Sequence, residues 1–254
     1  MVKSEQQRQR KLAKKRSKDI QKRKVIARKQ QELGSLAGKM QLASRGRIIY
    51  SGISTAIRET GIGHVVIARE APSGEFAVAV FLVDAYCLGV KDTFGVLRVP
   101  SDARELLKNL EMHGLTPASP GLARGLVEGA IEYARSLGLA PHSDYRKLAP
   151  IWGDLPVESI AGKFEFGREG QPCYISGPHD DEAKQNLILR TLETKVGANN
   201  FKFTIGGPGM AGLVLPEHWT EFTEETDDGV ESEDWFEGSI DGEVIQRIDN
   251  PERE

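Results

Sequence analysis

The chain has 254 residues, 39% of them hydrophobic and 28% charged, and its formal net charge is −3. It holds no run of the about 20 apolar residues that a membrane-spanning helix needs, and its first residues, MVKSEQQRQRKLAKK, lack the apolar stretch of a secretory signal, so we expect a cytoplasmic protein with no membrane partner. Two cysteines, Cys87 and Cys173, are too few for a disulfide framework or a four-cysteine zinc site, and we expect both to be buried and reduced.

The first 30 residues form a strongly basic arm, with 13 Lys and Arg side chains against two acidic ones. Glycine and proline are absent before Gly34, and Lys, Arg, Gln and Ala are good helix formers, so residues 1–45 are predicted to be a helical or disordered arm. Such a block of charge is typical of segments that neutralise phosphates, although a solvated tail that pairs with the acidic end is the alternative. The candidate nucleic-acid-binding residues are Arg8, Arg10, Lys11, Lys14, Lys15, Arg16, Lys18, Lys22, Arg23, Lys24, Arg28 and Lys29.

The middle of the chain, residues 46–215, predicts one α+β domain of antiparallel hairpins packed with three or four helices. Residues 61–70 and 76–90 are rich in strand-forming side chains, and the PSG sequence between them predicts a β-hairpin. The second run is apolar throughout, so we expect both of its faces to be covered and a bend or bulge near Asp84 to Cys87.

Two helices are expected after this hairpin. The first is predicted to begin with Ser101 as its N-cap, because apolar residues recur at helical spacing after it, and the second covers residues 119–138. Within the second helix, Gly125 and Gly129 lie four residues apart and would let another segment approach the helix backbone closely.

The rest of the domain predicts a second hairpin, a helix and a strand. Residues 163–175 alternate apolar and polar side chains on both sides of an Arg-Glu-Gly turn, which indicates the hairpin. The helix is expected to begin at Asp180 or Asp181 and to end at Gly197, and residues 201–205 predict the strand.

Residues 216–254 predict an acidic, largely disordered tail. Residues 217–254 hold 15 acidic side chains against two arginines, with aromatic residues spaced among the acids. That composition is typical of binding segments that contact a basic surface, on this chain or on another protein, although the first two aromatic residues would equally complete the core. The candidate partner-binding residues are Trp219, Phe222, Trp235 and Phe236.

One set of residues in the domain suggests metal chemistry. Asp84 is a carboxylate inside an apolar run, and a buried charge is costly unless it is paired, for example with Lys91 or an arginine. If Asp84 instead converges with Asp92, His142 and Asp144, the four side chains would resemble the carboxylate sites that hold Mg²⁺ in nucleases. Helix capping and a buried ion pair are the alternative explanation for the same residues.

The separation of charge favours a nucleic-acid-associated accessory protein, with RNA or a ribosome preferred as the partner and no cofactor. In this hypothesis the basic arm contacts phosphates without sequence preference, and the acidic tail competes for the arm. Two alternatives stay open. The first is a metal-dependent hydrolase or nuclease that uses the carboxylate and histidine residues of the domain. The second is a protein–protein interaction module that acts through the acidic-aromatic tail.

Overall fold

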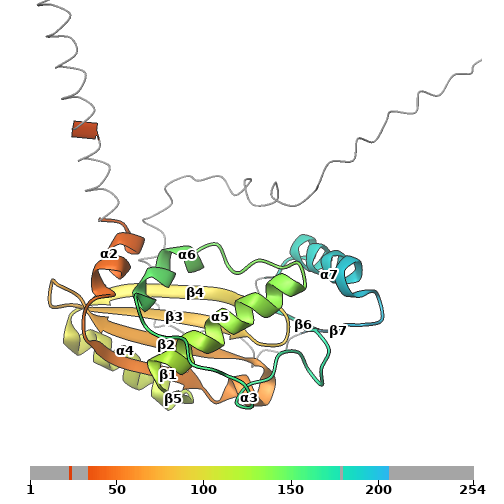
Figure 1. Cartoon of the computed structure of the whole chain (residues 1–254), viewed down its shortest axis with the longest axis horizontal. Coiled ribbons are helices and arrows are strands. Elements are labelled where there is room, and N and C mark those ends of the chain that lie inside the picture. Colours follow the sequence, from red (N-terminus) through yellow and green to blue (C-terminus); the bar gives the residue numbers. More distant parts are fainter. Residues whose placement is uncertain (1–22, 25–33, 178–179, 206–254) are drawn as a thin grey trace, which may run out of the picture. The chain divides into compact units, whose positions relative to one another are not determined.

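An antiparallel sheet of five strands organises the described part of the chain, which comprises residues 23–24, 34–177 and 180–205 of this computed structural model (Figure 1). Four long strands follow one another along the chain, and a short fifth strand lies beside the first, giving the order β4-β3-β2-β1-β5. The strands are β1 (Ile48–Ser54), β2 (Ile62–Glu70), β3 (Phe76–Asp84), β4 (Gly89–Arg98) and β5 (Leu115–Pro117). The pairing of β2 with β3 confirms the first predicted hairpin, and the α+β class is as the sequence predicts.

The long apolar run over residues 76–90 is divided by a turn. β3 ends at Asp84, residues 85–88 reverse the chain, and β4 begins at Gly89, whose φ of +70° favours glycine. The bend predicted near Asp84 to Cys87 is therefore a full reversal of direction. The irregularity in strand pairing lies further along, where the β3–β4 register shifts around Lys91.

One face of the sheet is covered by four helices that lie on the same side. They are α2 (Leu36–Ala43), α5 (Pro120–Ser136), α6 (Tyr145–Leu148) and the 3₁₀ helix η1 (Ala149–Trp152). Phe81 of β3 lies in this core, with its ring stacked on that of Trp152 at a centroid distance of 5.3 Å. Met40 and Ala43 of α2 are fully buried in the same core, so the folded body includes a helix that precedes the domain start expected at residue 46.

Two further helices connect strands of the sheet. α3 (Ala56–Thr60) joins β1 to β2, and α4 (Pro100–Met112) packs against β3, β4 and β5. The sequence correctly predicts the buried stripe of α4 and its opening at Pro100-Ser101, but the predicted N-cap is wrong, because Val99 and not Ser101 holds that position. Ser101 bonds to the side chain of Asp102 instead of capping the helix. None of the helices in the described ranges is long and apolar enough to cross a membrane.

The second hairpin predicted from the sequence, over residues 163–175, is wrong. β6 (Cys173–Ser176) pairs in parallel with β7 (Lys202–Ile205), and the two strands are joined through α7 (Glu182–Val196). Residues 163–172 contribute only an isolated bridge, in a segment turned by glycines with positive φ. The alternation of side chains is local, whereas the partner of β6 comes from much later in the chain. α7 begins and ends as predicted, with Asp181 as its N-cap and Gly197 after its last turn.

The glycines of α5 meet another segment, as the sequence predicts. A Cβ at Gly125 would lie 2.3 Å from the carbonyl oxygen of Glu158, and one at Gly129 would lie 2.9 Å from the Ile160 side chain. Because the first of these contacts is to a main-chain atom, the segment that follows η1 cannot give way without moving its backbone.

We predict that Gly125→Ala lowers the free energy of unfolding by about 1–3 kcal/mol, the usual cost of overpacking, although alanine favours the helix. Thermal or denaturant unfolding measures the change. Gly34→Ala is the control, because nothing lies within 4 Å of a Cβ at Gly34. Equal stability of the two variants would contradict the close approach.

Candidate functional site

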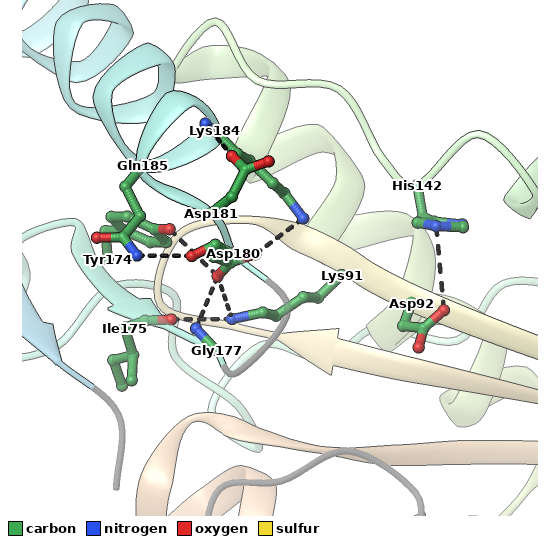
Figure 2. Close-up of polar contacts among 10 residues, drawn as sticks. All are labelled: Lys91, Asp92, His142, Tyr174, Ile175, Gly177, Asp180, Asp181, Lys184 and Gln185. Carbon is green, nitrogen blue, oxygen red and sulfur yellow. Dashed lines mark hydrogen bonds and ion pairs between the residues drawn. The ribbon is translucent and has the colours of Figure 1, made fainter. Parts of the chain in front are cut away.

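A bulge in β4 redirects the side chain of Lys91. The register pairs Leu82 with Asp92 and then Val83 with Val90, which leaves Lys91 as an extra residue without a partner across β3. Bulges of this kind re-aim a side chain. Lys91 Nζ donates to the carbonyl oxygen of Ile175 at 2.9 Å and lies 3.1 Å from Asp180 Oδ2 (Figure 2).

Asp180 is the centre of these contacts. Its Oδ2 accepts from the N–H of Gly177 at 2.7 Å and from the hydroxyl of Tyr174 at 3.1 Å, in addition to the ion pair with Lys91. Its Oδ1 lies 2.8 Å from Lys184 Nζ, on the first turn of α7. We call Lys91, Tyr174, Asp180 and Lys184 the lysine–aspartate cluster, which joins β4, β6 and α7 (Figure 2).

The electrostatics of this cluster fix its protonation state. Burial alone would raise the pKa of Asp180, but the hydrogen bonds from Lys184 and Gly177 and the charge of Lys91 outweigh it and lower the pKa to about 2. Burial and the neighbouring Asp180 raise the pKa of Tyr174, so its phenol keeps the proton that it donates. At neutral pH Asp180 is therefore ionised. Its ion pairs with Lys91 and Lys184 connect β4 to the start of α7.

Asp84 is fully buried and shapes the turn between β3 and β4. Its Oδ1 accepts from the N–H groups of Tyr86 at 2.9 Å and Cys87 at 3.0 Å, while Oδ2 has no hydrogen-bond partner among the described residues. Burial raises the pKa of Asp84 to about 6, and the charge of Lys91 limits the rise. The ion pair that the sequence suggested between Asp84 and Lys91 is replaced by the pair of Lys91 with Asp180.

The structure brings together three of the four residues suggested as metal ligands. His142 Nε2 lies 4.0 Å from Asp92 Oδ1 (Figure 2). The N–H of Asp144 donates to His142 Nδ1 at 3.3 Å. The carboxylate of Asp144 pairs with Lys147 at 2.9 Å. Asp92 is exposed, whereas Asp84 is enclosed by the β3–β4 turn. Among the residues that the structure describes, no group of three or more His, Cys, Asp or Glu side chains is placed to hold a metal ion.

We call Asp92, His142 and Asp144 the surface group. His142 accepts one hydrogen bond at Nδ1, while its Nε2 faces Asp92 at a distance too long for a hydrogen bond. Because Nδ1 accepts from the main chain, the tautomer that fits carries its proton on Nε2, on the side of Asp92. His142 is itself held to the sheet, since its N–H donates to the carbonyl of Val90 at 2.8 Å.

The predicted arm and tail residues fall mostly outside the described ranges. Arg23 and Lys24 are helical and exposed, while the other ten candidate residues of the arm and all four candidate residues of the tail lie outside the described residues. Both cysteines are buried and free, as expected, and burial raises the pKa of the Cys87 thiol.

Sequence reasoning missed the role of Asp180 as a buried ion-pair partner, because its place next to Asp181 is also that of a helix cap. The sequence does contain one indication of a buried ion pair, because the charged residue Lys91 directly follows an apolar run. Its partner lies far away in the sequence, so spacing could not identify it.

We predict that Lys91→Met lowers the free energy of unfolding by about 3 kcal/mol, because it removes the buried partner of Asp180 and leaves this buried carboxylate with only the half-exposed Lys184 as its counter-charge. The matched change Lys184→Met should cost less than about 1 kcal/mol, because that lysine is half exposed. Denaturant unfolding at neutral pH measures both variants. A similar loss in both would show that the bulge does not set the stability of the cluster.

We predict that Asp84→Asn raises the free energy of unfolding at pH 8 by up to about 3 kcal/mol, the equivalent of about two pKa units. The stability that Asp84 contributes is fully present below its ordinary pKa of 3.8 and is lost as the pH rises through about 6. Unfolding measured from pH 4 to pH 8 should therefore show the gain growing with pH. The same pH dependence in both proteins would contradict a raised pKa.

The described polar groups thus form two neighbouring arrangements, the buried lysine–aspartate cluster around Asp180 and the surface group around His142 (Figure 2). The lysine–aspartate cluster joins β4, β6 and α7. The surface group holds the loop after α5 against β4. No protein-family model, curated protein or solved structure matches this chain.

Proposed function

We propose that this is a cytoplasmic, nucleic-acid-associated protein whose basic arm neutralises backbone phosphates, with RNA as the preferred partner. The observation that carries the proposal is the density of charge in the first 30 residues, 13 basic side chains against two acidic ones. Phosphate neutralisation releases counterions and gives affinity that depends steeply on salt and weakly on sequence. The arm holds no Trp, Tyr or Phe, so base stacking adds nothing from this segment.

The attachment of the arm to the folded body supports this role. α2 begins at Leu36, a few residues after the basic block of the first 30 residues, and the side chain of Ser35 caps it by accepting from the N–H of Gly38. Met40 and Ala43 then fix the helix in the core. Whatever the arm binds is therefore tied to the sheet through a short helix that two buried residues anchor in the core, which suits a protein that positions its folded body on a nucleic acid.

The acidic tail is proposed as an internal competitor. Residues 217–254 carry 15 acidic side chains, enough to offset the charge of the arm. Attraction between the two blocks would extend over about one Debye length, ~10 Å at 0.1 M salt, and would weaken as salt rises. Competition of this kind selects for dense polyanions over isolated phosphates.

The test is a salt titration of binding with the full-length protein. We expect the variant with Lys14, Lys15, Arg16 and Lys18 each changed to Gln to reduce the slope of log K against log salt by up to about 3 on single-stranded RNA, at about 0.7 for each phosphate contact. Fluorescence anisotropy of a labelled RNA oligonucleotide gives the slope, and glutamine preserves the helix propensity of the arm.

The matched control changes four exposed cations of the body, Lys108, Lys163, Arg190 and Lys195, to Gln. Net charge falls equally in the two variants, so a loss confined to the arm variant assigns the binding to the arm. Changing Glu224, Glu225, Asp227 and Asp228 to their amides should tighten binding if the tail competes. Equal slopes for the wild type and the arm variant would refute the proposal.

A further inference from the structure

Basic residues continue past the first 30 residues into the folded body. Residues 34–47 hold Lys39, Arg45 and Arg47 and no acidic side chain. Lys39 lies on α2, and both Lys39 and Arg45 are exposed. Arg47 instead pairs with Glu70 at 3.3 Å. The first two cations therefore extend the charge of the arm onto a surface of defined geometry.

The backbone around Arg45 is held rigidly from inside. Nη1 of the buried Arg69 donates to the carbonyl oxygens of Ser44 at 2.6 Å and Gly46 at 3.0 Å, the two residues that flank Arg45. Because both carbonyls point toward Arg69, the main chain at Arg45 has little freedom to rotate, while its side chain stays in solvent. One buried arginine thus fixes the position of an exposed one.

α6 brings further cations to the same side of the sheet. α2 packs against α6 and η1, and the two helices lie next to each other in Figure 1. Arg146 and Lys147 of α6 are exposed, and Lys147 forms an exposed ion pair with Asp144 at 2.9 Å. An exposed pair of this kind is worth about 0–1 kcal/mol, so a phosphate can displace the carboxylate at small cost.

We propose that Lys39, Arg45, Arg146 and Lys147, here called the basic ledge, form a second phosphate-contacting surface that continues the arm on the folded body. This inference rests on the proposed function. Lys39 lies on α2 and Arg45 directly follows Ser44, the C-cap of that helix, so both cations belong to the short segment whose helix packs against α6. Cations whose backbone is already ordered lose less conformational entropy on binding, so the ledge fixes how the body sits on the sugar–phosphate backbone.

The experiment compares four full-length proteins on a single-stranded RNA oligonucleotide and on a DNA duplex. They are the wild type, the arm variant described above, the ledge variant Lys39→Gln/Arg45→Gln/Lys147→Gln, and the control Lys108→Gln/Arg190→Gln/Lys195→Gln. We expect the ledge variant to reduce the salt slope by up to about 2 on RNA and up to about 3 on the duplex, and the control to leave it unchanged. The altered residues are exposed, so thermal unfolding should stay close to that of the wild type in both variants.

Each outcome separates this inference from the proposed function. If the arm variant loses slope and the ledge variant matches the control, the ledge is refuted and the proposed function stands. If the ledge variant loses slope and the arm variant does not, the ledge is supported and the role of the arm is wrong. If the wild type shows no salt-dependent binding to either probe, both fail.

Discussion

The buried guanidinium of Arg69 holds the helical layer onto the sheet. Arg69 lies near the end of β2 and is 5% exposed, and it donates to the carbonyls of Ser44, Gly46 and Trp152. Ser44 is the C-cap of α2, where the helix dipole places partial negative charge, and Trp152 ends η1. Hydrogen bonds that involve a charged group contribute about 1.5–3 kcal/mol each, so three of them offset much of the cost of burying the cation. The planar fork of arginine reaches the carbonyls from two separate nitrogens, Nη1 and Nη2, whereas lysine has a single donor nitrogen.

The bulge at Lys91 connects β6 and α7 to the sheet, as Arg69 connects the helical layer. A regular strand would place successive side chains on alternate faces, and the extra residue breaks that alternation. Lys91 then meets Asp180 at the start of α7, while its charge also limits the rise in the pKa of Asp84 in the neighbouring turn. One cation therefore serves two buried carboxylates. The two differ because Asp180 has several charged and polar partners, whereas Asp84 has mainly backbone N–H groups.

The sequence predicts what local patterns determine and misses what distant residues determine. The β2–β3 hairpin and the buried stripes of α4 and α5 follow from spacing within one segment. The parallel pairing of β6 with β7 and the Lys91–Asp180 ion pair join residues far apart in the chain, so no local pattern contains them. Arg69 shows the same limit, because an arginine near the end of a strand reads as solvated, and only the arrival of α2 and η1 buries it.

Repulsion among the cations around α2 affects both the stability of this region and the binding proposed for it. Arg69 is a buried cation whose pKa burial lowers, and Arg45 lies between the two residues whose carbonyls it holds. Lys39 precedes them on the same segment, residues 34–47, which has no acidic side chain. Like charges so placed repel one another, and the repulsion works against the docking of α2 that Arg69 makes possible. Glu70 pairs with Arg47 and offsets the charge of that residue, whereas Lys39 and Arg45 are exposed to solvent. A polyanion laid across the ledge would remove this repulsion and strengthen the same junction, so binding by the arm and stability of the body would favour each other through α2.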